Sequence, residues 1–217
     1  MSQALHDLRT EDDPVAIAQG ALLLCLSGPN DDLLQDNSTW LNTAIQYAKI
    51  CRANRCDSES VCPTERNIRK RLWWCCVIRD RLISLGMRRP LQITPESFDP
   101  DQPLEGLVQD LQDESGRSIV HDFATKRQLA DLFLLHIGLV IALTDTLMAV
   151  YPPDGAETPQ LSSLRDYADA VSRIQLCKSK LERWSHTFST QFPQSRRQRH
   201  LHRSAFLCGS LLTIYHQ

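Results

Sequence analysis

Residues 69–90 of the chain read RKRLWWCCVIRDRLISLGMRRP. Apolar side chains recur in and just before this stretch at spacings of three and four, at Ile68, Leu72, Trp73, Cys76 and Val77. That spacing is typical of an amphipathic helix. We expect the helix to begin at Pro63, because proline is favoured in the first helical turn, and to end near Leu85, where Gly86 can stop it.

Two adjacent tryptophans and one aspartate stand out in this stretch. Trp73 and Trp74 point about 100° apart on a helix, so one should pack inward and the other against a neighbouring helix. Asp80 lies about two turns beyond Trp73 in apolar sequence, so it should point inward and need a cationic or backbone donor as partner. Arg89, in the loop that follows, is the predicted partner.

Helical patterns continue on both sides, separated by proline and glycine. Further helices are expected at 15–27 after the Asp13-Pro14 start, from Asp36 or Ser38 to about 55, and at about 119–150, 161–192 and 195–217. Between 88 and 117 four prolines interrupt the pattern. The predicted fold class is therefore all-α, an irregular array of about six helices with a long acidic linker.

The same breaks suggest the domain organisation. A tail at 1–13 precedes one domain at 14–217, which divides into a first half at 14–105, a linker at 106–117 and a helical second half at 118–217. We expect this second half to be truncated at its C-terminus, since the apolar pattern of its last helix continues to Tyr215 and no further helix follows to cover it.

The composition is that of a globular protein. The 217 residues are 42% hydrophobic and 23% charged, and 24 Lys+Arg against 26 Asp+Glu give a net charge of -2. This balance disfavours a disordered chain and a histone-like basic binder. The N-terminus has no secretory signal pattern, so an intracellular protein without disulfides is expected, and most of the eight cysteines should be core residues.

Residues 132–150 are nearly all apolar and long enough to suggest a membrane span. His136 and Asp145 interrupt the run, with Thr144 and Thr146 beside the aspartate. An ionisable group at bilayer depth is costly. We therefore predict a buried central helix and no membrane contact.

The order of residues in 69–90 resembles the signature of the fungal-specific transcription factor domain, the regulatory middle region of binuclear zinc cluster transcription factors. The matching positions are Arg69, Lys70, Arg71, Trp73, Trp74, Asp80, Ser84, Arg89 and Pro90. Residues 40–48 and the terminal stretch 211–216 resemble two other helices of the family. Among the matches, Arg69, Arg71, Trp73, Trp74, Asp80, Arg89 and Pro90 are the predicted signature residues, with a structural or regulatory role.

The chain departs from that family at three places. Arg88 stands where the family has the glycine before Arg-Pro, so Gly86 is the alternative turn residue. Cys51-Arg52-Ala53 replaces a Gly-Leu-His turn. The zinc cluster is absent, and no Cys-x-x-Cys occurs in the sequence; this is a departure of the sequence from the family's full-length pattern.

No metal, cofactor or catalytic residue is predicted. Cys51, Cys56 and Cys62 match no zinc ligand spacing, and His200, His202 and Cys208 do not share one helix face. No phosphate loop, nucleophile elbow or His-Glu-x-x-His motif is present. An enzyme is therefore not expected.

Basic segments could suggest nucleic-acid binding. Residues 66–89 carry eight basic side chains against Asp80 alone, and 196–203 add more. Residues 96–122, however, carry eight acidic side chains, and we expect the acidic linker to neutralise the basic helix.

The resemblance implies a transcriptional regulator in the nucleus, or alternatively in the cytoplasm, whose DNA contacts are made by a separate zinc cluster domain. It implies a protein partner, as homo- or hetero-oligomer with a related factor, and is compatible with a small-molecule effector. The expected interaction surface comprises Leu207, Leu211, Ile214 and Tyr215. The alternative hypothesis is a cytosolic helical metabolite-binding protein or enzyme, which a deep polar pocket near Asp80 or His136 would favour.

Overall fold

The computed structural model describes residues 11–26, 33–55, 62–97, 104, 107–108, 122–153 and 163–191. Within these ranges it has five α-helices and no strand: α2 (Pro14–Leu24), α3 (Leu33–Ile50), α4 (Pro63–Met87), α6 (Phe123–Val150) and α7 (Leu164–Gln191). Short 3-10 turns lie at Ala53–Arg55 and Pro95–Ser97. The all-α prediction is confirmed, and five described helices are close to the expected six.

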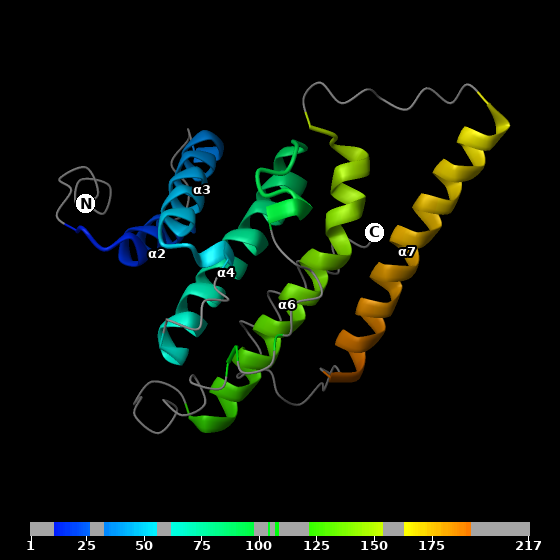
Figure 1. The fold of residues 1–217 in the computed structure, drawn as a ribbon. Coiled ribbons are helices and arrows are strands. Elements are labelled where there is room, and N and C mark those ends of the chain that lie inside the picture. Colours follow the sequence, from blue (N-terminus) through cyan, green and yellow to red (C-terminus); the bar gives the residue numbers. More distant parts are fainter. Residues whose placement is uncertain are drawn as a thin grey trace.

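The helices lie side by side in an order that nearly follows the sequence (Figure 1). α2, α3 and α4 pack against one another, α6 packs on α4, and α7 packs on α6. The main core contains apolar side chains from α2, α3 and α4, joined by Ile93 and Leu107 and by Ile137 and Val140 of α6. α4 and α6 therefore form the junction between the first and second halves of the chain.

Three helix starts follow directly from local capping signals. Asp13 accepts a hydrogen bond from the Val15 N–H at 3.0 Å, and Pro14 occupies the first helical position. Pro63 opens α4 as predicted. Asp122 caps α6 by accepting from the Thr125 N–H at 2.7 Å.

Several predicted boundaries are wrong: α2 ends at Leu24 and not at 27, α3 ends at Ile50 and not near 55, and α6 begins at Phe123 and not near 119. Two further differences have a structural cause. α3 begins at Leu33, so Ser38 lies inside the helix, where its hydroxyl contacts the Met87 sulfur at 3.3 Å. α4 runs through Gly86 to Met87, and Arg88 adopts the left-handed conformation with φ 53°. Contacts between α3 and α4 and a C-terminal turn at Arg88 thus override the two local signals.

Of the described helices, α6 is long and apolar enough by length and composition to cross a membrane. A core helix meets the same two criteria. Here α6 packs between α4 and α7 (Figure 1), and its buried residues include Leu135, Ile137, Val140 and Leu147. The structure thus places α6 centrally among the described helices, as the sequence predicted, with 39% of its most apolar 18 residues buried.

Several expectations fall on residues outside the described ranges. These are most of the acidic linker, the helix expected at 195–217, and the surface residues Leu207, Leu211, Ile214 and Tyr215. The predicted break after α6 is described only at 151–153, where Pro152 and Pro153 follow the helix.

Candidate functional site

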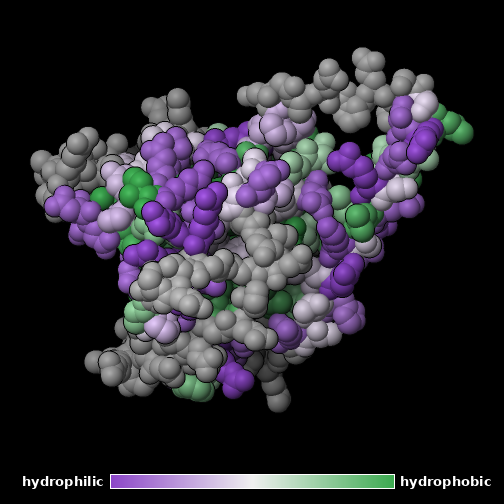
Figure 2. Space-filling model, viewed as in Figure 1, coloured by the Kyte–Doolittle hydropathy of each residue, from purple (hydrophilic) through white to green (hydrophobic). Residues whose placement is uncertain are grey.

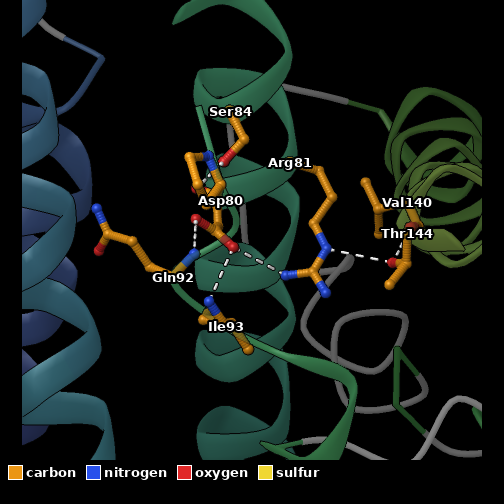
Figure 3. A network of polar contacts seen from close by, with 8 residues as sticks. Asp80, Arg81, Ser84, Gln92, Ile93, Val140 and Thr144 are labelled. Atoms are coloured by element: carbon orange, nitrogen blue, oxygen red, sulfur yellow. Dashed lines mark hydrogen bonds and ion pairs between the residues drawn. The ribbon is translucent and has the colours of Figure 1, made fainter. Parts of the chain in front are cut away.

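Asp80, one of the predicted signature residues, lies at the centre of a buried polar network on α4 (Figure 3). The Asp80 side chain is fully buried, and so is that of Arg81. Arg81 donates from Nη1 to Asp80 Oδ2 at 3.0 Å. The predicted need for a cationic partner is met, but the hydrogen-bonded cation is Arg81 and not Arg89.

Asp80 also binds the backbone of the loop that follows α4. The Gln92 N–H donates to Oδ1 at 3.1 Å, and the Ile93 N–H donates to Oδ2 at 3.0 Å. Ser84 strengthens the same contact, because its hydroxyl donates to the Pro90 carbonyl at 3.3 Å. The carboxylate thus holds the loop against α4 and places Ile93 in the core.

Arg81 extends the network to α6. Its Nε donates to Thr144 Oγ1 at 3.3 Å, and Thr144 in turn donates to the Val140 carbonyl at 2.7 Å. Figure 3 shows Arg81 reaching from α4 toward Thr144. One ion pair therefore connects α4, its following loop and the central helix of the second half.

Burial determines the electrostatics of this pair. Desolvation raises the pKa of the Asp80 carboxyl, and the Ile93 N–H, the Arg81 charge and the Gln92 N–H oppose that rise. Desolvation likewise lowers the pKa of Arg81 to about 10, against the stabilising charge of Asp80. Arg81 therefore remains protonated at neutral pH, and removing either partner would leave the other poorly solvated.

The arginines of α4 bind the C-terminal ends of neighbouring helices. Arg79 donates to the carbonyl of Cys25, which caps α2, and Arg69 donates to the carbonyl of Cys51, just after α3, at 3.0 Å. Helix C-termini carry partial negative charge and unpaired carbonyls, so cations are favoured there. Arg71 reaches further along the chain, to the Leu107 carbonyl at 2.8 Å.

The two tryptophans are both in the core. Trp73 and Trp74 are buried, together with Cys76 and Val77 of the same helix. Arg89 and Pro90 lie in the loop that Asp80 holds, half exposed. The structure thus distributes the signature residues along α4 and its following loop, where their described contacts are packing, hydrogen bonds to backbone carbonyls and one ion pair.

Sequence reasoning missed Arg81 and Thr144. Arg81 was visible as the neighbour of Asp80, and Thr144 as a hydroxyl within an apolar run. The sequence does not indicate that these two residues contact each other, because they are 63 residues apart. A polar residue in an otherwise apolar central helix was the available signal.

The described residues hold no group of three or more His, Cys, Asp or Glu side chains placed to bind a metal ion. Cys25, Cys51 and Cys76 are buried free thiols. Burial raises the pKa of all three, and it raises the pKa of the half-buried Cys75 to about 11. These four cysteines are therefore protonated packing residues at neutral pH.

An open groove of about 580 Å³ lies where the start of α2, the end of α3 and the start of α4 meet. Its lining includes the apolar residues Val15, Ile50 and Ile68 and the ion pair between Glu65 and Arg69. Its lining does not include Asp80 or His136, near which a deep polar pocket would have favoured a metabolite-binding protein or an enzyme.

The fold and this network define a class of protein: an α-helical domain in which one helix, α4, organises its neighbours through buried aromatic and charged residues. A family model described as the fungal specific transcription factor domain matches residues 2–204. The chain belongs to this family, as the resemblance implied.

Curated relatives include cutinase transcription factor 1 beta of Fusarium vanettenii, 31% identical over 158 residues, which cover 69% of this chain and 18% of that protein. Cutinase transcription factor 1 alpha of the same organism is 29% identical over 116 residues, covering 52% of this chain and 13% of that protein. A transcriptional regulatory protein of Schizosaccharomyces pombe is 32% identical over 118 residues, covering 54% and 15%. The chain therefore spans less than a fifth of these relatives. No solved structure matches it.

Proposed function

We propose that this chain is a regulatory domain that controls transcription through protein contacts, while a separate zinc cluster domain makes the DNA contacts. Membership in the family, together with relatives named as transcription factors, supports the regulatory role. In this proposal the domain acts in the nucleus and performs no catalysis.

The contacts of the α4 arginines support the assignment of DNA binding to another domain. Arg69, Arg71 and Arg79 bind backbone carbonyls, and Arg81 binds Asp80. Phosphate binding requires cations that are free to displace counterions. The most basic helix of the described chain uses much of its charge for internal contacts instead.

A reporter assay tests the regulatory role. The full chain is fused to a heterologous DNA-binding domain whose site lies upstream of a reporter gene, in fungal cells. We expect the fusion to change reporter output relative to the DNA-binding domain alone. Asp80→Ala should reduce that change, because it lowers the folded fraction of the domain, whereas Asp145→Ala, at an exposed pair with Lys180, should preserve it.

A fusion that is folded and nuclear yet leaves the reporter unchanged would contradict the regulatory proposal.

A mobility-shift assay at about physiological salt tests whether the DNA contacts are made by a separate domain. We expect no sequence-specific DNA binding by the chain alone, and a dissociation constant tighter than roughly micromolar would contradict this expectation.

We further propose Leu207, Leu211, Ile214 and Tyr215 as a contact surface for a related factor. Their spacing of three and four residues is typical of one face of a helix that binds another helix. Leu211→Glu should weaken co-purification with a full-length relative, and Thr213→Glu, off this face, is the matched control.

The groove between α2, α3 and α4 supports a second proposal, a small-molecule effector. Its volume of about 580 Å³ is in the range of small-ligand sites, and it combines apolar walls with charged groups. A metabolite screen by thermal shift tests this proposal. A ligand at this site should stabilise the chain but not an Ile68→Trp variant, in which the groove is filled; equal stabilisation of both would contradict the assignment.

A further inference from the structure

The α7 helix has an apolar stripe that is not covered by any described part of the chain. α7 packs on α6 through Trp184, whose indole N–H donates to the Leu135 carbonyl at 2.8 Å, and through Lys180, which pairs with Asp145. Beside this contact lies the α7 stripe, which comprises Leu164, Tyr167, Val171, Ile174, Lys178 and Leu181.

The stripe is strongly exposed for residues of this kind. Leu164 is 90% exposed, Ile174 67% and Tyr167 60%, while Val171 and Leu181 are half-buried. Figure 2 shows hydrophobic atoms at the surface over α7, among hydrophilic ones. An apolar surface continuing along a helix marks a contact site.

The spacing of the stripe indicates that its partner is another helix. Its residues follow one another at intervals of three, four, three, four and three. This is the heptad spacing with which two helices pack side by side, each residue inserting between residues of the other. A flat surface or an extended peptide would not require this alternation.

The order of residues along the α7 stripe allows it to pack against the same stripe of a second copy that runs in the opposite direction. In that register Leu164 lies opposite Leu181 of the other copy, and Val171 lies opposite Ile174. Lys178, the one charged member, pairs with Glu182 of its own helix at 3.8 Å and lies opposite Tyr167, whose ring can accept a cation–π contact. In a parallel pair Lys178 would face Lys178, and two like charges would meet.

We propose that α7 pairs with α7 of a second copy of this chain, antiparallel, about a two-fold axis between residues 172 and 173. A two-fold axis makes the same stripe serve on both copies, so every contact forms twice. The inference extends the partner contact proposed above to a different surface, and it stands even if the chain does not regulate transcription.

Sedimentation of the full chain tests the pairing. We expect a dimer at tens of micromolar concentration. Ile174→Glu should weaken the dimer by about tenfold or more, because it places a charge near the axis. Leu176→Glu is the matched control: Leu176 is also exposed, at 54%, but points away from the stripe, so this variant should remain dimeric.

A charge exchange tests the antiparallel register. Tyr167→Lys should weaken the dimer, because the new lysine faces Lys178 of the other copy. Adding Lys178→Glu should restore the dimer, because residue 167 of each copy then meets a carboxylate. The two positions are 11 residues apart on one helix, about 16 Å, so the rescue cannot come from a contact within one copy.

Three results would overturn the proposal. They are a wild-type chain that stays monomeric at about 100 micromolar, an Ile174→Glu variant as dimeric as Leu176→Glu, and a double variant that does not recover. A monomeric chain in which Ile174→Glu lowers the melting temperature more than Leu176→Glu would assign the stripe to another segment of the same chain. The reporter assay reads the proposed function independently, because a fusion can act without this dimer.

Discussion

Arg88 adopts an unfavourable backbone conformation that its neighbours impose. It ends α4 with φ 53°, in the left-handed region, and its side chain is exposed. The Arg89 N–H closes the turn on the Ser84 carbonyl at 3.1 Å. A non-glycine residue in this conformation costs roughly 1–2 kcal/mol, and the contacts of the following loop with Asp80 maintain it.

We therefore predict that Arg88→Gly raises the free energy of unfolding by about 1 kcal/mol. Arg88→Ala, which removes the side chain but keeps a Cβ atom, is the control and should give little or no gain. Chemical denaturation of the two variants measures the difference. Equal stabilities would mean that the left-handed turn carries no strain.

Asp80, in contrast to Arg88, stabilises the fold, and it does so through its charge. Asp80→Ala should lower the free energy of unfolding by about 3–5 kcal/mol, since it leaves Arg81 buried without its counterion and two backbone N–H groups without an acceptor. Asp145→Ala breaks an exposed pair with Lys180 and should cost less than about 1 kcal/mol. Similar losses in the free energy of unfolding of the two variants would show that the buried network stabilises the fold no more than the exposed pair does.

At the scale of elements, α4 determines how the first half assembles. Its arginines bind carbonyls at the ends of α2 and α3, and its tryptophans fill the space between the helices. A helix that looks basic in sequence is therefore a packing element whose charges satisfy backbone groups.

Trp184 is the main apolar contact in the described attachment of α7 to α6. Trp184 is the buried residue of α7; it stacks on Phe188 and lies 3.4 Å from the position a Cβ atom would take at Gly138. Trp184→Phe should cost about 1 kcal/mol by removing the hydrogen bond to Leu135, and Trp184→Ala about 3–5 kcal/mol by opening a cavity. Equal melting temperatures for the two variants would contradict this assignment of a small cost to the hydrogen bond and a larger cost to the cavity.

At the scale of the whole molecule, stability should depend on pH through His136 of the central helix. Desolvation lowers the pKa of His136, against a hydrogen bond to the Leu132 carbonyl. The unfolded chain therefore takes up a proton at a higher pH than the folded chain does. The stability from this residue is fully present above the ordinary histidine pKa of about 6.5 and is lost as pH falls through the folded pKa.

We expect the free energy of unfolding, and with it the melting temperature, to fall between pH 7.5 and pH 5.5. The slope of the free energy from this one residue is at most about 1.4 kcal/mol per pH unit. His136→Gln should reduce the fall, whereas His186→Gln, at an exposed position on α7, should not. An unchanged pH profile in His136→Gln would assign the dependence to other groups.

The sequence by itself determined the helical class and those helix boundaries that carry a proline signal. Asp13-Pro14, Pro63 and the prolines after Val150 act within one helical turn, and apolar periodicity acts within one helix, so these signals can be read locally. The signature in 69–90 also sufficed to predict the family, because its residues lie close together in sequence.

Only the tertiary structure decided what those residues contact. Arg81 pairs with Asp80 and reaches Thr144 of α6, Arg79 caps α2, and Arg88 rather than Gly86 forms the turn. Each of these outcomes depends on which helices pack together and at what angle. A buried charge takes whichever partner the packing places beside it, and that choice has no signature in the neighbouring sequence.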